Sequence, residues 1–444
     1  MRLQILTPEY DGYSGGIVTF YRHLGPVLKE LGVDVHVLEG SAYHASDEYS
    51  SRVVDGVTVQ TLERARLRSW WRRFGHFSGM PGLRRHMAAA WAMWEQANCG
   101  ADADIVEASD WGLLFVPSVI EATRPLVVQC HGSVGQIGTH DPMLGEETEN
   151  VAMRLLESAA LSKALSIQTL SSSNAEFWNR ECGREVEIIR PVWAGAPTEP
   201  NGVVPSTRGL VVGRLQKWKG PEIAVQALRR LGPRAPAIDW IGRDTSWDAS
   251  RNSASSYLSR LYPDVWQAKF FHNPPVAPSE IAQRQARALF NLVPSTWDVF
   301  NFTAVEGMAS GRPTIVSEGA GASELVEDGV NGFLFSSGDP EALAAAIEGV
   351  LAKSTAQLAA IGRAAQETVR NVLNPEAIAR KRLAVYRSVI GNFGQGPRPP
   401  VESWLADICR PKNDRFDEAA FLENFPMQLL AKNLTKRVMR RLWR

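Results

Sequence analysis

The chain has 444 residues, which is enough for two or three domains of ordinary size. Hydrophobic residues make up 44% and charged residues 22%, the balance of a globular protein rather than a disordered one. The 48 Lys and Arg residues equal the 48 Asp and Glu residues, so the net charge is zero. We therefore expect no nucleic-acid partner, because such partners require a basic surface.

The four cysteines are far apart, at Cys99, Cys130, Cys182 and Cys409. They show neither the spacing of a metal site nor a disulfide framework, which favours a reducing, cytoplasmic environment. The chain starts directly with a predicted strand, and no segment resembles the apolar part of a signal peptide. No run of about 18 apolar residues is present, so we expect no membrane-spanning segment.

The first elements form a βαβ unit. A strand at Leu3–Leu6 leads into a glycine-rich loop, an amphipathic helix that ends near Gly32, and a second strand at Val33–Leu38. The paired Gly15 and Gly16 at the helix start would let backbone N–H groups approach a ligand closely. A Gly-Gly pair is also common in simple turns, so both readings stay open.

Residues 64–96 mix arginines with Trp70, Trp71, Phe74 and Phe77. Such a mixture suits contact with anionic lipid headgroups. The alternative is an ordinary pair of helices whose aromatic side chains pack inward.

Two further strands are predicted at 103–108 and 125–130. Asp102 and Asp104 stand at the start of the first one, and we interpret them as a strand boundary rather than a metal site. His131 follows the second strand and precedes a glycine, which places it at the edge where open α/β sheets bind ligands. The Pro-rich and polar segment 197–206 is a predicted linker between domains.

The second half opens with a strand at Gly209–Val212 and the loop GRLQKWKG. Arg214 and Lys219 would converge at a strand-to-helix turn, where a guanidinium and an ammonium can bind a pyrophosphate. Further on, Gly242 follows another strand, at 237–241.

A buried strand at 288–295 leads into DVFNFTAVEGMASGRPTI, residues 298–315. The polar turn opens a helix at a strand end, so free N–H groups and the helix dipole favour an anion there. Asp298 and Glu306 flank this turn, and their carboxylates suit hydroxyl groups of a sugar or ribose. The pattern indicates a phosphate pocket between two polyol-binding acids.

This segment resembles the Glu-x7-Glu signature of retaining glycosyltransferases of family 4, the glycosyl transferases group 1, which have the GT-B fold. The loop Gly213–Gly220 is similar to the G-R-x-x-x-x-K-G loop of that family. Two positions depart from the pattern, because Asp298 replaces the usual Glu and Asn301 replaces the usual Gly. The resemblance covers about residues 1–390.

The resemblance implies an α/β protein of GT-B fold, with two Rossmann-like doubly wound domains facing across a cleft and a helical C-terminal extension. We expect an N-terminal acceptor-side domain at 1–200 and a nucleotide-sugar domain at 205–374. A crossover helix is expected at 375–390, and an extension at 391–444.

The resemblance also implies roles for individual residues. The expected catalytic residues are His131 near the reacting carbon, Arg214 and Lys219 on the diphosphate, and Asp298 on the donor sugar. Glu306 would hold the ribose, and the other expected donor-binding residues are Gly15, Gly16, Gly242, Phe300, Asn301, Phe302 and Thr303. Neither a metal nor a cofactor is expected, since the nucleotide sugar is a co-substrate.

The expected reaction is hexosyl transfer from a nucleotide sugar to a hydroxyl acceptor, with retention and without metal. A glycan or lipid-linked saccharide of the cell envelope is the expected acceptor, which implies a role in polysaccharide biosynthesis. One alternative is a nucleotide-sugar epimerase of the same fold. The other is a catalytically degenerate scaffold or binding protein.

The end of the chain, residues 420–444, is basic and amphipathic. Leu430, Leu434, Val438 and Leu442 recur at helical spacing among arginines and lysines. This pattern suits an anionic membrane surface, and thus a peripheral position at the inner face of a membrane. The alternative is a packed or solvated end.

Overall fold

The computed structural model describes residues 1–11, 15–141, 147–195, 206–247, 252–395 and 399–412, with 426–428, 431, 434–435 and 438–439. The chain forms two compact units, which are described separately. The first consists of Met1–Thr169, Ala175–Ile189 and Ala379–Arg444, and the second of Leu170–Asn174 and Arg190–Ile378. The predicted linker at 197–206 lies outside the described residues except for Ser206.

In its described part, the first unit contains an eight-stranded sheet of order β3-β4-β2-β1-β5-β6-β7-β8. Its strands are β1 (Arg2–Thr7), β2 (Asp34–Glu39), β3 (Ser51–Val54), β4 (Val57–Thr61), β5 (Ile105–Ser109), β6 (Leu126–Gln129), β7 (Ser166–Thr169) and β8 (Glu187–Ile188). All neighbours pair in parallel except β3 and β4, which are antiparallel. Because the chain crosses over between parallel strands, helices lie on both faces.

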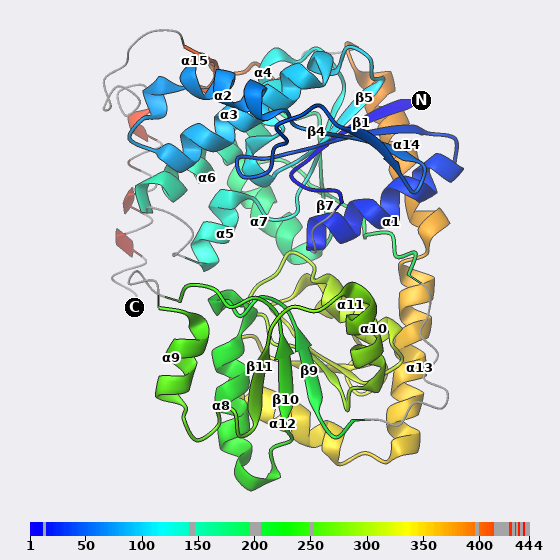
Figure 1. Ribbon diagram of the computed structural model, residues 1–444. Helices are drawn as coiled ribbons and strands as arrows, with labels where there is room; N and C mark the ends of the chain where they lie inside the picture. The colour runs from blue at the N-terminus through cyan, green and yellow to red at the C-terminus, as the bar shows by residue number, and fades with distance from the viewer. Residues whose placement is uncertain are drawn as a thin grey trace. The chain divides into compact units, whose positions relative to one another are not determined.

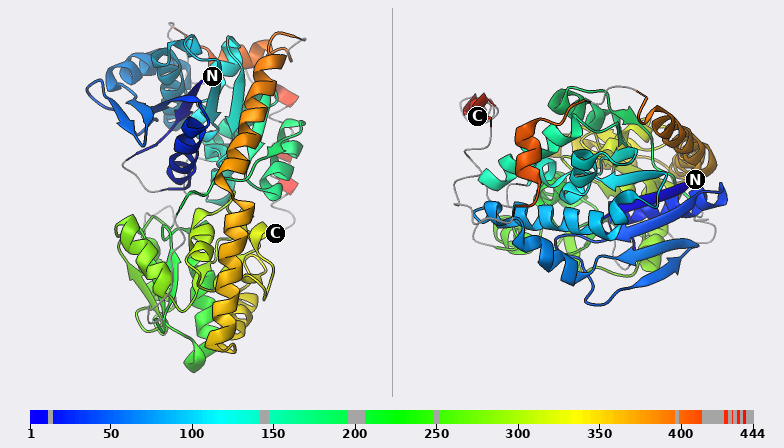
Figure 2. Two further views of the ribbon diagram at one scale, coloured as in Figure 1. Left: turned by 90° about the vertical axis from the view of Figure 1, so that its right-hand side faces the viewer. Right: turned by 90° about the horizontal axis from the view of Figure 1, so that it is seen from above.

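One face of this sheet is covered by α1 (Gly16–Glu30) and α14 (Pro375–Asn392), as Figure 1 and Figure 2 show. The other face carries the helices α2 (Arg64–Arg72), α3 (Pro81–Gln96), α4 (Val116–Glu121), α5 (Val134–His140), α6 (Glu147–Leu161), α7 (Ser172–Cys182) and α15 (Ser403–Cys409). Side chains alternate between the two faces along each strand, so Leu6 and Leu38 join the core under α3.

The aromatic side chains of segment 64–96 pack into this core. Phe74 and Phe77 are fully buried, and Trp70 stacks on Trp91 with ring centroids 5.5 Å apart. The guanidinium of Arg73 lies 4.5 Å from the Trp70 ring, where cation–π attraction stabilises it. For Trp70, Phe74 and Phe77 the alternative of an ordinary helix pair with inward-packed aromatic side chains therefore holds, whereas Trp71 is only half-buried.

Part of the C-terminal extension belongs to the same core. Leu405, Ile408 and Cys409 of α15 are buried. The indole N–H of Trp91 donates a hydrogen bond of 2.8 Å to the carbonyl of Cys409, and a ring nitrogen of His76 lies 2.9 Å from the carbonyl of Ile408. Residues 403–409 thus close the core formed by segment 64–96.

A buried charge network attaches α14 to the sheet. The Arg382 guanidinium donates a 2.7 Å hydrogen bond to Glu107 on β5, and both side chains are almost fully buried. It also donates to the side-chain oxygen of Gln129 on β6, and the Tyr386 hydroxyl donates to Glu107. A buried charge requires such pairing, so this helix has one defined register on the sheet.

In the described residues, the second unit contains a fully parallel sheet of order β11-β10-β9-β12-β13-β14. Its strands are β9 (Gly209–Val212), β10 (Ile238–Ile241), β11 (Phe270–Asn273), β12 (Asn291–Val293), β13 (Thr314–Ser317) and β14 (Phe333–Phe335). Numbered within the unit, the order is 3-2-1-4-5-6, that of a Rossmann fold. The chain reverses its direction of winding between β9 and β12, and ligands bind at such a point.

Helices cover both faces of the second sheet (Figure 1). One face packs against α8 (Pro221–Leu231), α9 (Ala254–Leu261) and α12 (Pro340–Leu351). The other carries α10 (Pro278–Arg287), α11 (Phe302–Ala309) and α13 (Thr355–Val372). No helix among the described residues is both long and apolar enough to cross a membrane.

Replacing Ile408 with alanine should lower the free energy of unfolding by about 2–4 kcal/mol, because it leaves a cavity under α15. Ile408 is 1% exposed, whereas its neighbour Asp407 is exposed to solvent. Asp407→Ala is therefore the matched control, with an expected change within about 0.5 kcal/mol. Urea denaturation followed by tryptophan fluorescence measures both; equal effects would show that α15 contributes no packing energy.

Candidate functional site

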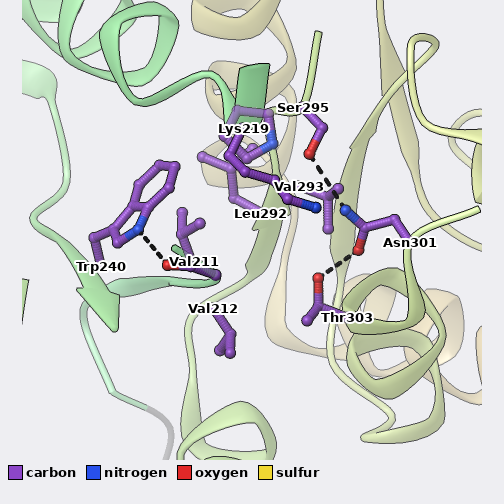
Figure 3. Close-up of a pocket in the computed structure, with 11 residues that line it drawn as sticks. Val211, Val212, Lys219, Trp240, Leu292, Val293, Ser295, Asn301 and Thr303 are labelled. Carbon is purple, nitrogen blue, oxygen red and sulfur yellow. Dashed lines mark hydrogen bonds between the residues drawn. The ribbon is translucent and has the colours of Figure 1, made fainter. Parts of the chain in front are cut away.

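A small pocket lies where the second sheet reverses its winding. It is formed by the ends of β9 and β12 and by the start of α11 (Figure 3). Lys219, Ser295, Asn301 and Thr303 supply its polar groups, and Trp240 closes one side. The pocket thus joins both motifs that the sequence singled out, the loop after β9 and the turn before α11.

The loop after β9 approaches the end of β12 very closely. Gly220 has φ +75°, and a Cβ atom there would lie 1.9 Å from the carbonyl oxygen of Pro294. Only glycine fits this combination of conformation and contact. The backbone N–H of Thr296 donates to the carbonyl of Trp218 over 2.9 Å, which joins the two strand exits. This close approach places Lys219 beside the residues that follow β12.

Lys219, Asp298 and Asn301 form one hydrogen-bonded group. The Lys219 Nζ lies 2.5 Å from Oδ2 of Asp298, and both side chains are mostly buried. The same carboxylate oxygen accepts a 2.8 Å hydrogen bond from the Asn301 amide. The Lys219 ammonium also lies 4.1 Å from the Trp218 ring. These contacts hold one ammonium at the pocket in a defined position.

The backbone of Asn301 explains why this chain has asparagine at a position where family 4 usually has glycine. Asn301 has φ 83°, in the left-handed region that glycine adopts most easily and asparagine better than most others. It is also the N-cap of α11, because its Oδ1 accepts from the N–H of Ala304 and from the hydroxyl of Thr303. The departure therefore preserves the turn and adds a helix cap.

Glu306 lies on the second turn of α11, and its surroundings favour the neutral acid. Burial raises the pKa of Glu306 to about 7, although a 3.3 Å hydrogen bond from the Gln285 amide to its Oε2 opposes the rise. Gln285 is itself buried on α10. The sequence analysis did not single out Gln285, because nothing in its local pattern points to a residue 21 positions away.

The other expected donor-side residues differ in what they expose. Arg214 follows β9 with an exposed side chain and does not line the pocket. Phe300 and Phe302 are buried, with ring centroids 5.7 Å apart, so they would reach a ligand only through the backbone. Gly242 is required by packing, since a Cβ there would lie 1.9 Å from the Gly213 carbonyl oxygen.

In the first unit, His131 lies beyond the carboxyl end of β6 and contacts α1. Its ring meets those of Phe20 and Tyr21 edge-on, at centroid distances of 4.7 and 5.4 Å. Its Nε2 is buried and has no hydrogen-bond partner among the described residues. Burial, with a smaller effect of the nearby Arg382 cation, lowers the pKa of His131 to about 3, so the imidazole is neutral near pH 7.

Two buried acids hold the loop that carries His131. Asp110 accepts the backbone N–H groups of His131 and Gly132 over 2.9 and 3.2 Å. Glu157 accepts the Ser133 hydroxyl over 2.6 Å and the Gly135 N–H over 3.0 Å. Burial raises the pKa of Asp110 to about 7 and that of Glu157 to about 8. Sequence reasoning missed both roles, because the acids precede and follow the loop by about 20 residues.

Gly15 and Gly16 open α1, and the preceding residues 12–14 lie outside the described residues. Gly15 is extended, and a Cβ atom there would meet nothing within 4 Å. Packing against the described residues therefore does not require glycine at position 15.

The buried imidazole of His131 should make the free energy of unfolding depend on pH, because it resists protonation in the folded state only. Because its pKa is about 3 when folded and about 6.5 when unfolded, its penalty is absent above pH 6.5 and grows as the pH falls. Relative to His131→Phe, which keeps an aromatic ring, the wild type should lose about 2 kcal/mol between about pH 7.5 and about pH 5. Parallel urea titrations test this, and identical pH profiles would contradict a buried neutral imidazole.

Comparison with known proteins matches part of this chain to a known family. The profile of the Glycosyl transferases group 1 matches residues 206–353. The chain is 31% identical over 227 residues to D-inositol 3-phosphate glycosyltransferase from Mycobacterium marinum, an alignment that spans 50% of this chain and 47% of that protein. The chain thus spans about half the length of the first such relatives. It is also 26% identical over 431 residues to glycogen synthase from Mycobacterium tuberculosis, covering 90% and 98% of the two chains.

Solved structures agree with the fold. Sucrose-phosphate synthase from Thermosynechococcus elongatus matches with a TM-score of 0.66 at 19% identity, over 88% of this chain and 99% of that one. HepE from Anabaena, solved in complex with UDP-glucose, matches with a TM-score of 0.60 at 18% identity, over 87% and 100%. These structures share the GT-B fold, as expected from the sequence. Residues 206–353 therefore match the glycosyl transferases group 1, and the chain has the GT-B fold.

Proposed function

We propose that this glycosyltransferase moves a hexose from a nucleotide sugar to a hydroxyl acceptor with retention at the anomeric carbon. The observation that carries the proposal is the pocket at the β9–β12 reversal, where the Lys219 ammonium and the N-terminus of α11 meet. An ammonium and free helix N–H groups together suit a diphosphate. The complex of HepE with UDP-glucose supports a nucleotide-sugar donor by analogy of fold.

The chemical difficulty in this reaction is the charge that develops on the leaving diphosphate. Lys219 is held in place by Asp298, so its charge needs no reorganisation when the bond breaks. Preorganised donors of this kind contribute about 3 kcal/mol each in comparable sites. Arg214, which follows the same strand, would supply a second cation. With two cations and a helix terminus, the diphosphate requires no metal.

The two acids would bind hydroxyl groups. Asp298 already accepts hydrogen bonds from Lys219 and Asn301 through Oδ2, which leaves Oδ1 for a hydroxyl of the donor sugar. Glu306, with a pKa raised to about 7, would hold the ribose. In the first unit, His131 offers a buried Nε2 without a protein partner, and a neutral imidazole suits a hydroxyl of the donor sugar.

The expected acceptor is a glycan or lipid-linked saccharide of the cell envelope. A peripheral position at a membrane stays part of this proposal through the basic end of the chain, most of which lies outside the described residues. The described positions Leu434 and Val438 are 59% and 55% exposed, so these two apolar side chains are accessible to a partner. The epimerase and the degenerate scaffold receive no support from the relatives.

Incubating the protein with a panel of radiolabelled nucleotide sugars tests the reaction class. We expect label transfer that depends on an added acceptor and proceeds in excess chelator. Isomerisation of the donor without an acceptor would instead identify an epimerase. If a donor raises the melting temperature of the protein but is neither transferred nor isomerised, the protein is a binding protein.

Lys219→Ala should lower kcat by about 100- to 1,000-fold, because it removes one preorganised donor to the leaving diphosphate. Lys217→Ala is the matched control, since Lys217 lies in the same loop with an exposed side chain. Circular dichroism and thermal melting establish that both variants fold. Undiminished turnover in folded Lys219→Ala would remove Lys219 from the mechanism.

A further inference from the structure

A row of polar side chains crosses one face of the first sheet near the amino ends of its strands. Gln4 on β1, His36 on β2 and Thr58 on β4 are direct neighbours in the parallel register. Gln4 and His36 lie two positions before Leu6 and Leu38, which share their face of the sheet and pack in the core under α3. Parallel sheets are normally apolar on both faces, so this polar row needs an explanation.

The row forms the floor of a hollow with a volume of about 130 Å³, which also includes Gln60. The wall is the end of α3, at Gln96, and the turn that follows it. Gln96 is fixed at both ends of its amide: it accepts from the N–H of Glu63 and donates to the carbonyl of Thr61, each over 2.9 Å. The hollow is therefore preformed.

The rim next to Gln96 has an unusual backbone. Asn98 and Cys99 have φ angles of 51° and 50°, so two successive residues other than glycine adopt the left-handed conformation. Such conformations are disfavoured for side chains and concentrate at ligand-binding sites. Asparagine is common in this conformation just after a helix, so Cys99 is the unusual residue of the rim.

Charges of both signs surround the hollow. Asp34 lies 3.0 Å from Nε2 of His36 and 3.9 Å from Nε of Arg2, and Asp102 accepts the Asn98 amide over 3.1 Å. By contrast, the side-chain oxygens of Gln4, Thr58 and Gln60 accept no hydrogen bond within the described part of the chain. The lining residues Arg2 and Asp102 have opposite charges, so the hollow does not select for an anion, and its neutral side-chain oxygens suit hydroxyl groups.

An exposed aromatic ring stands beside these groups. The Gln60 amide donates a 3.1 Å hydrogen bond to the Tyr49 hydroxyl, and Tyr49 is 63% exposed. The apolar face of a sugar ring can pack on an aromatic ring, while the hydroxyl groups at the edge of the sugar bind amide and hydroxyl groups of the protein. Carboxamides, a hydroxyl and an open tyrosine together indicate a saccharide.

We propose that this polar hollow, formed by Gln4, His36, Thr58, Gln60 and Asn98 with Tyr49 at its edge, is a second saccharide-binding site that takes part of an uncharged glycan chain. It lies at the amino ends of the strands, whereas His131 follows the carboxyl end of β6, so it is distinct from the candidate active site of this unit. The proposal does not depend on the proposed reaction. A second site would retain a polymeric ligand by raising its effective concentration.

Native affinity electrophoresis in gels that contain glycogen, dextran or yeast mannan tests this site without any turnover. At least one of these neutral polymers should retard the wild-type protein. The double variant Thr58→Ala/Gln60→Ala should bind that polymer about tenfold more weakly, the effect of two lost hydrogen bonds. The matched control Gln283→Ala/Thr355→Ala, at exposed positions of the second unit, should bind like the wild type.

Retardation of the wild type by none of the three polymers would overturn the proposal, as would equal binding by the wild type and the Thr58→Ala/Gln60→Ala variant. A gel that contains heparin separates charge-driven binding, and retardation by heparin alone would also overturn it. The electrophoresis measures polymer binding and not sugar transfer. The two experiments can therefore fail independently, so a negative transfer assay does not invalidate the binding test.

Discussion

The ion pair of Lys219 with Asp298 joins two segments that are 79 residues apart, and the candidate site depends on it. It forms because Gly220 lets the loop after β9 touch the end of β12, a contact that any side chain at that position would prevent. The carboxylate is also bonded to Asn301, which caps α11. One acid therefore connects the cation, the turn and the helix terminus, and the position of each constrains the other two.

In the first unit, buried acids also fix the position of the candidate residue, His131. His131 makes no polar contact to a described residue through Nε2, and its loop is fixed instead through backbone N–H groups that bond to buried Asp110 and Glu157. Burying a carboxyl group costs free energy unless its oxygens accept hydrogen bonds. The N–H groups of the loop therefore stabilise the buried acids, and the acids in turn fix the loop. Within the described part of the chain, the imidazole keeps a buried Nε2 without a hydrogen-bond partner.

The core of the first unit shows how composition can mislead. Arginines and aromatic residues alternate through segment 64–96 in a manner typical of a membrane surface, yet Trp70, Phe74 and Phe77 are buried. The arginines lie over the rings or remain at the surface, and α15 covers the remaining apolar face. A sequence records which residues are present in a helix but not which element will cover it.

The sequence alone was enough to predict the GT-B fold and the two loops of the second unit, because strand, turn and helix signals there are local. It also marked Asp298 and Asn301 as departures, although only the backbone of Asn301, at φ 83°, shows why asparagine is accepted. Gln285, Asp110, Glu157 and the Arg382–Glu107 pair needed the tertiary structure, because each contact joins residues far apart in the chain. The polar row across β1, β2 and β4 also needed it, since register between strands decides which side chains become neighbours.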